Sequence, residues 1–120
     1  MYFKDKEHEN FYTELIKLYS DKDPYYNCLY YLFGLTEDTR KNFNRVFDVV
    51  ERKIKPQGLN EPWQTGTTIA ITRLAFNLFN GFTGFDGKYD DIRNYTVENT
   101  FYRKELVKYF FQAIAIRFEL

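Results

Sequence analysis

The chain has 120 residues, and 17 Lys and Arg side chains balance 17 Asp and Glu, so its formal net charge is zero. This balance excludes the basic surface of a typical nucleic-acid-binding protein and the acidic surface of a DNA mimic, so we expect no direct nucleic-acid binding. The length suits a single globular domain over residues 1–120.

Cysteine content and hydropathy indicate an intracellular protein. Cys28 is the single cysteine, which excludes an internal disulfide and a cysteine metal cage. The stretch Met1–Asp5 lacks the apolar run of a signal peptide, and the sequence has no run of about 18 apolar residues that would span a membrane. We therefore expect a cytoplasmic protein without membrane association.

The aromatic content is unusual, with 13 Phe, 11 Tyr and 1 Trp side chains. One small domain cannot hide all these rings, so some tyrosines are expected at the surface, where they suit a protein partner or a homo-oligomer. The alternative is a coding bias toward Phe, Tyr, Asn, Lys and Ile that carries no functional content.

The first predicted helix begins after Asp5, whose carboxylate is placed to cap it, and runs to about Ser20. A polar link over residues 20–23 follows. Apolar residues at i, i+4 and i+8 predict that one broad face of this helix is buried, centred on Phe11, Leu15 and Tyr19.

Two further helices are predicted before residue 48. Asp23 followed by proline is a strong helix start, and Gly34 ends this short, apolar helix. Thr36 is placed to cap a third helix through about Phe47. The inner face of the third helix is expected to hold Phe43, Val46, Phe47 and Val50.

A strongly apolar helix near the middle of the chain is predicted to be the central packing element. Thr67 or Thr68 is placed to cap its N-terminus, and Gly81 is suited to end it in a left-handed conformation. Its buried stripe is expected to contain Ile71, Leu74, Leu78 and Phe79, with Ala70 and Ala75 allowing close approach.

The remaining segments are less regular. We expect an extended piece near Ile54, one helical turn at 56–60, and a loop over 81–95 with a small hairpin at Asp86-Gly87. Thr96 begins a further helical turn, and a final helix runs over about 103–117. Together these elements predict an all-α fold, an irregular orthogonal bundle of five to six helices.

Several blocks of the sequence resemble a family of small proteins of unknown function from Gram-positive gut bacteria, their phages and mobile elements. The resemblance implies a mobile-element setting and no assigned activity. Small proteins in that setting often bind a host or defence protein, as anti-CRISPR inhibitors do. The blocks are Phe3-Lys4-Asp5, His8-Glu9, Phe11, Leu32-Phe33-Gly34-Leu35-Thr36, Thr39-Arg40, Phe43, Ile54-Lys55-Pro56, Leu59-Asn60, Trp63-Gln64-Thr65-Gly66, Thr72-Arg73-Leu74-Ala75-Phe76-Asn77-Leu78, Tyr109-Phe110-Phe111-Gln112-Ala113-Ile114 and Arg117-Phe118.

Two clusters are candidate ligand sites. The first is the loop before the central helix, where amide N–H groups, hydroxyls and the helix dipole suit an anion, with Arg73 and Asn77 on a shared face. The alternative is plain capping, with Arg73 and Asn77 bonding neighbouring loops. The loop residues are Gln64, Thr65, Gly66 and Thr67. The second cluster would join His8 and Arg40 to Arg73 around a phosphate or carboxylate.

Catalysis, metals and cofactors have little support in the sequence. His8 is the single histidine, no nucleophile motif is present, and Asp86, Asp90 and Asp91 lack the ligand spacing of a calcium loop. We expect no cofactor and no metal. The favoured hypothesis is a non-catalytic protein-binding module, such as an anti-CRISPR-like inhibitor of a host protein. The alternative is a small-ligand protein that binds an anion or nucleotide at residues 64–68 with Arg73.

Overall fold

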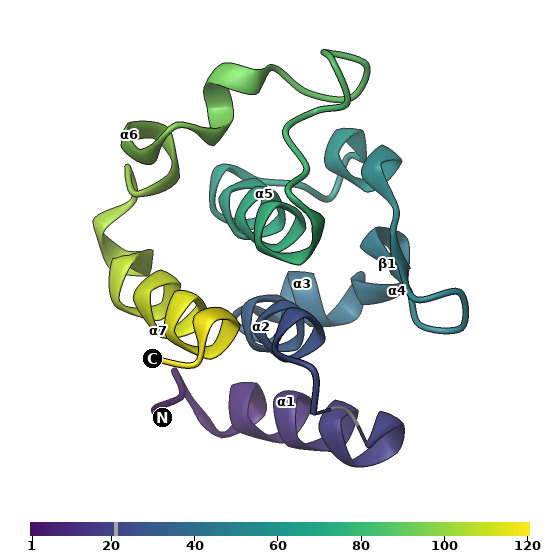
Figure 1. The fold of residues 1–120 in the computed structure, drawn as a ribbon, viewed down its shortest axis with the longest axis vertical. Coiled ribbons are helices and arrows are strands. Elements are labelled where there is room, and N and C mark those ends of the chain that lie inside the picture. The colour runs from purple at the N-terminus through teal and green to yellow at the C-terminus, as the bar shows by residue number, and fades with distance from the viewer. Residues whose placement is uncertain (21) are drawn as a thin grey trace.

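The computed structural model describes residues 1–20 and 22–120, and this part of the chain is mainly helical, which confirms the all-α prediction (Figure 1). Asp21 of the predicted polar link lies outside the described residues. The α-helices are α1 (Lys6–Tyr19), α2 (Pro24–Phe33), α3 (Glu37–Lys41), α4 (Phe43–Val46), α5 (Gly66–Asn80), α6 (Val97–Thr100) and α7 (Val107–Phe118). The 3-10 helices are η1 (Pro56–Asn60), η2 (Ile92–Tyr95) and η3 (Lys104–Leu106), and the strands are β1 (Phe47–Asp48) and β2 (Lys53–Ile54).

Helix α2 is the central packing element, with α1, α5 and α7 arranged around it (Figure 1). It carries no charged side chain and its residues Cys28–Phe33 are all buried, so it tolerates neighbours on every side. The Asp23 carboxylate accepts from the Tyr25 N–H at 2.9 Å, with Pro24 at the first helical position, as predicted. The prediction that the helix before Gly81 holds the central place was wrong, because α2 is the more completely enclosed helix.

Helix α5 starts earlier than predicted. Its N-cap is Thr65, not Thr67 or Thr68, because Thr65 and Thr68 form a reciprocal capping box. The Thr65 hydroxyl accepts from the Thr68 N–H at 3.2 Å, and the Thr68 hydroxyl accepts from the Thr65 N–H at 2.7 Å. Gly81 ends the helix with φ of 78°, as predicted. Of the predicted stripe, Ile71 and Leu74 are buried and Leu78 and Phe79 are half-buried.

Helix α1 is capped as predicted, because the Asp5 carboxylate accepts from the His8 N–H at 2.8 Å. Its buried face, however, is centred on His8 and Tyr12. Apolar periodicity does not predict this face, because histidine does not count as an apolar residue. The predicted stripe therefore lies to one side and is half-buried or exposed at Phe11, Leu15 and Tyr19.

The predicted helix after Thr36 is divided at Asn42 into α3 and α4. The Asn42 backbone leaves the helical region with φ of −105° and ψ of 18°, and its side-chain amide donates to the Asp38 carbonyl at 2.9 Å. The chain then enters the antiparallel pair β1–β2, in which Phe47 faces Ile54. Val50 was wrongly predicted on an inner face, because it lies in the turn between these strands and is 84% exposed.

No strand forms in residues 81–95, all of which are described, so the hairpin predicted at Asp86-Gly87 was wrong. The chain instead makes a tight turn in which Gly84, Phe85, Asp86 and Gly87 have φ of 102°, 47°, 56° and 87°. A side chain at Gly84 would overlap the backbone of Asp90, so the start of the turn packs directly against the backbone of Asp90. The predicted extended piece, the turn at 56–60 and the turn after Thr96 are confirmed as β2, η1 and α6.

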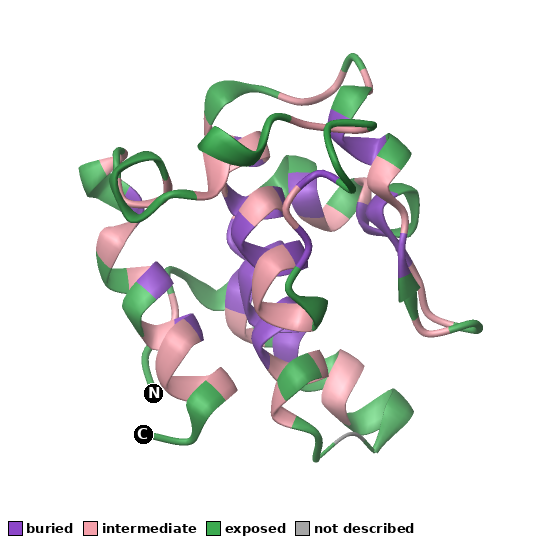
Figure 2. Ribbon diagram, turned by 45° about the horizontal axis from the view of Figure 1, so that its top comes forward, coloured by how far each residue is buried: buried purple, intermediate pink, exposed green. Residues whose placement is uncertain are grey.

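Buried residues gather in the middle of the molecule, and the outer segments are exposed (Figure 2). One hydrophobic cluster joins α2, α5 and α7 with buried residues from α1, α4, the β1–β2 pair, η1, η3 and the loop after α5. The short helix α6 contributes no buried residue. The segment around α6 therefore lies at the periphery of the molecule, where Val97 is exposed and Phe101 is half-buried.

Candidate functional site

The loop before α5 makes hydrogen bonds mainly within itself. The Thr68 hydroxyl donates to the Gln64 side-chain carbonyl at 2.7 Å, and the Gln64 amide donates to the Gly58 carbonyl at 3.1 Å. With the capping box between Thr65 and Thr68, these contacts fix the loop on η1 and on the first turn of α5. The contacts are those that plain capping requires.

A distant arginine lies against the same helix end. The Arg103 Nη1 donates to the Thr67 hydroxyl at 3.3 Å, and a side chain at Gly66 would collide with the Arg103 guanidinium. Arg103 also pairs with Glu105 at 3.4 Å. The cation beside this loop is thus Arg103, which lies 36 residues from Thr67 and left no local signal in the sequence.

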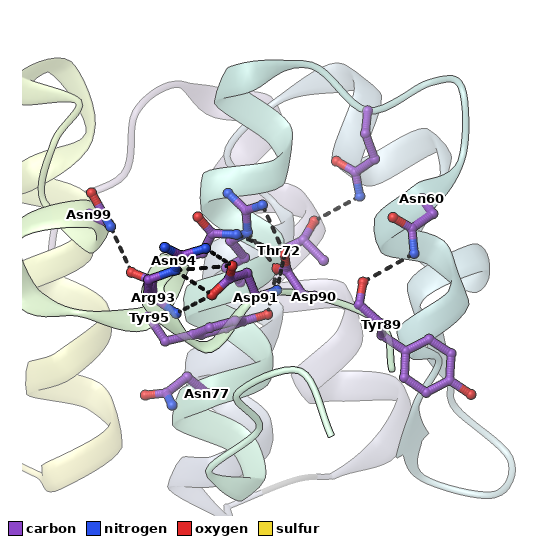
Figure 3. A network of polar contacts seen from close by, with 12 residues as sticks. Asn60, Thr72, Asn77, Tyr89, Asp90, Asp91, Arg93, Asn94, Tyr95 and Asn99 are labelled. Atoms are coloured by element: carbon purple, nitrogen blue, oxygen red, sulfur yellow. Dashed lines mark hydrogen bonds and ion pairs between the residues drawn. The ribbon is translucent and has the colours of Figure 1, made fainter. Parts of the chain in front are cut away.

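Arg73 is paired with Asp90 instead of facing the loop. Arg73 Nε donates to the Asp90 Oδ2 at 2.7 Å and its Nη2 donates to Oδ1 at 3.2 Å. Asn94 and Tyr95 add hydrogen bonds to the same carboxylate at 2.8 and 3.0 Å, and the Asp91 N–H adds another at 2.9 Å (Figure 3). Every acceptor direction of this carboxylate is thereby used. The cluster ties α5 to η2.

The pKa shifts of Asp90 and Tyr95 agree with a structural role for this cluster. Burial disfavours the charged form of Asp90, but the hydrogen bonds from Arg73 and Asn94 outweigh it and lower the pKa of the carboxyl. Burial, together with the neighbouring Asp90 charge, raises the pKa of Tyr95, which stays a neutral donor. Asp90 is therefore an ionised carboxylate held by a cation, two neutral side-chain donors and the Asp91 N–H.

The other predicted site residues have separate structural contacts. Asn77 donates to the Phe82 carbonyl at 3.1 Å, at the end of α5. The Arg40 Nη1 donates to the Gly34 carbonyl at 2.7 Å, and a side chain at Gly34 would press on the His8 ring. His8 and Arg40 thus both lie next to Gly34, whereas Arg73 bonds to Asp90. The structure brings together two members of the predicted His8, Arg40 and Arg73 cluster.

A surface hollow of about 790 Å³ lies beside the 84–87 turn. Asp90 and Asp91 lie on its wall, but Asp90 is bonded to Arg73, and Arg93 Nη2 donates to the Asp91 carboxylate at 2.6 Å. Among the described residues, no group of three or more His, Cys, Asp or Glu side chains is arranged to hold a metal ion. Two of the three aspartates in this wall, Asp90 and Asp91, are thus engaged by arginines, and Asp86 is the third.

An apolar groove of about 270 Å³ lies between α5, α6 and α7. Val97 and Phe118 lie in its wall and are 78% and 56% exposed, which is far more than a core position allows. Figure 2 shows α7, the helix that ends at the C label, as mostly half-buried or exposed. The full lining is Leu74, Asn77, Leu78, Tyr95, Val97, Thr100, Phe101, Ile114 and Phe118.

Arg117 fastens one end of this groove. Its Nε donates to the Leu78 carbonyl at 2.9 Å, and its guanidinium lies 3.5 Å from the Tyr25 ring centroid and 4.6 Å from that of Phe118. This stacking holds α7 against α5 and α2 while leaving Phe118 at the surface. The groove has no distinct signal in the sequence, because the spacing of Leu78 and Ile114 fits a buried stripe as well as a groove wall.

The comparisons with known proteins identify the family of the chain but assign it no activity. Within the described chain, no helix combines the length and apolarity needed to cross a membrane. No curated protein and no solved structure matches the chain. One family model matches residues 1–120, which is the full sequence, so the chain belongs to the family of unknown function DUF6075.

Proposed function

We propose that this chain is a non-catalytic protein-binding module whose partner docks in the apolar groove between α5, α6 and α7. The observation that carries the proposal is the exposure of Val97 and Phe118 beside a preformed apolar hollow. Burying one such side chain contributes about 1.5–3 kcal/mol. A partner that covers both side chains would gain this burial free energy, and further contacts must offset the cost of association before the complex reaches the net free energy of about 8 kcal/mol for micromolar affinity.

The aromatic surface near the groove supports the same proposal. The Phe101 ring lies 5.4 Å from that of Phe111, and Phe111 and Tyr102 are largely exposed. Exposed aromatic side chains that adjoin a hollow are the usual anchors of protein interfaces. Phe101 lines the groove and contacts Phe111, so this ring contact extends the candidate surface along α7.

The two side chains best suited to catalysis are poorly placed for it. Burial raises the pKa of the Cys28 thiol to about 12, so this sulfur is not a thiolate near neutral pH. His8 is fully buried, and each ring nitrogen has a backbone partner. These features favour binding over nucleophilic or general-base chemistry.

For the partner, we propose a host defence protein of the cytoplasm, with CRISPR effectors as the first class to test. The small size of the chain, its exposed apolar groove and its resemblance to phage and mobile-element proteins support this choice. The origin in a phage or mobile element of Gram-positive gut bacteria is part of the same proposal.

Capture of proteins from a lysate of a Gram-positive host that carries CRISPR effectors tests this function. We expect the wild-type chain to retain an effector in stoichiometric amount, and Val97→Asp to lose it because a carboxylate in the groove is costly to bury. Val50→Asp is the matched control, since Val50 is equally exposed in the turn between β1 and β2. Recovery of no effector, or equal recovery by Val97→Asp, would reject the proposal.

A second candidate function is anion or nucleotide binding at residues 64–68. The observation in its favour is Arg103, which brings a cation to the first turn of α5, where helix N–H groups attract negative charge. In this version Arg103 replaces Arg73 as the charged member of the site. Thermal-shift measurements with phosphate and nucleotides should then show a rise in melting temperature that Arg103→Gln removes and Lys104→Gln keeps. No rise with any of these anions would exclude this candidate.

A further inference from the structure

Residues Tyr2–Asp5, here called the N-terminal strap, lie across α2 and α7. The Tyr2 hydroxyl donates to the Lys108 carbonyl at 2.7 Å, and the Tyr31 hydroxyl donates to the Tyr2 carbonyl at 3.0 Å. The Lys4 ammonium donates to the Leu35 carbonyl at 3.1 Å. Figure 1 shows the N-terminal segment beside α7, and Tyr2 contacts Lys108 and Tyr109 in the first turn of that helix. The strap thus fastens two helices that are far apart in the sequence.

The ring of His8 is the buried end of this attachment. The Lys4 N–H donates to Nδ1 at 3.0 Å, and Nε2 lies 2.7 Å from the Tyr31 carbonyl oxygen. A backbone amide can only donate and a carbonyl can only accept, so Nδ1 carries no hydrogen and Nε2 carries one. The closed strap therefore requires neutral His8 in this single tautomer.

Aromatic packing completes the enclosure of the ring. The Phe3 ring lies 5.2 Å from the His8 ring in an edge-to-face arrangement, and the Tyr31 ring lies 4.5 Å from it. Tyr109 of α7 approaches from another side at 6.5 Å. No part of the His8 side chain is exposed to solvent.

We propose that His8 is an acid-sensitive latch that holds the strap closed when neutral and releases it when protonated. A second hydrogen on the ring would sit on Nδ1 and point at the Lys4 N–H, so that two donors would face each other. The bond from Nε2 to Tyr31 survives this change. The strap moves more easily than α2, because Tyr2, Lys4 and Asp5 are exposed and α2 is buried.

Charged groups around His8 modify a pKa that burial of the ring lowers. Lys4 from the strap and Arg40 from α3 oppose a positive ring, and the Asp5 carboxylate favours it. Tyr12 and Tyr31 are neutral neighbours, burial raises the pKa of each phenol further, and Tyr109 adds a third ring from α7. Burial is the largest influence and lowers the pKa of His8 from its ordinary 6.5, against the opposing bond to Tyr31.

The lowered pKa of His8 decides whether acid stabilises or destabilises the closed strap. The open state, with a solvated ring, binds a proton near the ordinary value, whereas the closed state resists it. The closed strap therefore has its full stability above pH 6.5 and loses stability as the pH falls through 6.5 toward the lower pKa of the closed state. Acid would uncover the Tyr31 and Tyr109 rings between α1, α2 and α7. This inference is independent of the proposed function.

Nuclear magnetic resonance of the full chain from about pH 7.5 to about pH 5 tests the latch. As the His8 ring protonates, we expect the Lys4 amide to lose hydrogen-exchange protection and the contact between the Phe3 and Tyr31 rings to disappear. Amides within α2 should keep their protection. The latch is overturned if Lys4 stays protected while His8 is charged, if α2 loses protection in step with Lys4, or if His8 stays neutral until the whole chain unfolds.

A pair of variants gives a second readout that does not alter the His8 ring. Phe3→Ala weakens the closed strap, so by reciprocal linkage it should raise the pKa of His8 toward its ordinary value. Phe111→Ala removes an exposed ring elsewhere on α7 and should leave that pKa unchanged. Equal His8 titration in the wild type and in Phe3→Ala would show that the strap and His8 are not coupled.

Discussion

At the scale of single residues, an arginine–aspartate pair contributes more to stability when it is enclosed than when it is exposed to solvent. Arg73 and Arg93 both pair with an aspartate, and both pairs include two or more nitrogen–oxygen contacts. The Arg73 side chain is 25% exposed and that of its partner Asp90 is 10% exposed, whereas the Arg93 pair lies in solvent. Solvent screening makes the outer pair weak, and the enclosed pair is costly to break.

We therefore predict that Arg73→Ala lowers the free energy of unfolding by about 2–3 kcal/mol, because it leaves the enclosed Asp90 carboxylate without its cation. The loss is less than for a fully buried pair because water can partly reach this site. Urea denaturation at constant slope measures it. Arg93→Ala is the matched control and should leave the midpoint unchanged. An unchanged midpoint for Arg73→Ala would contradict the structural role of the pair between Arg73 and Asp90.

At the scale of elements, caps could be predicted from the sequence and long-range partners could not. Asp5, Asp23 and Gly81 act on backbone groups within four residues, so their signals are local. The contacts of Arg103 with Thr67 and of Arg73 with Asp90 join residues 36 and 17 positions apart. Such pairs depend on how the helices pack, which no window along the chain contains.

Burial faces were predictable only where they followed apolar periodicity. Ile71 and Leu74 fit the pattern and are buried. His8 is buried because its polar nitrogens find backbone partners, an arrangement that hydropathy does not register. The groove was missed for the opposite reason, since apolar side chains such as Val97 stay exposed there.

The start of α5 gives a prediction at this scale. Thr65→Ala should destabilise the chain by about 0.5–2 kcal/mol, because it removes the acceptor for the Thr68 N–H. Thr67→Ala should have a smaller effect, since the Thr67 hydroxyl caps nothing and only accepts from Arg103. Thermal unfolding of the two variants compares them directly. A larger loss for Thr67→Ala would contradict the observed cap.

At the scale of the whole molecule, α2 organises the packing and α6 marks the open edge. α2 is surrounded by three helices, and α6 only covers the side of the groove. The Cα radius of gyration is 13.1 Å, which agrees with the roughly 13–14 Å expected for a compact chain of this length. The same compactness leaves one apolar groove between α5, α6 and α7 only partly filled.

The central place of α2 predicts a large effect of Leu32→Ala. Leu32 is fully buried, so its truncation should cost about 2–5 kcal/mol through lost burial and the cavity left behind. Leu18→Ala is the control, because Leu18 is 73% exposed and should change the midpoint little. Chemical denaturation of both variants at constant slope measures the difference. Equal midpoints would contradict a core built around α2.

The central claim is that the groove between α5, α6 and α7 receives a protein partner. Hydrogen exchange of the chain, free and in complex with the captured effector, tests it most directly. The account predicts slower exchange in α6, in the adjoining residues 101–102 and in α7, with the β1–β2 turn unchanged. Protection confined to other surfaces, or no stable complex to measure, would contradict it.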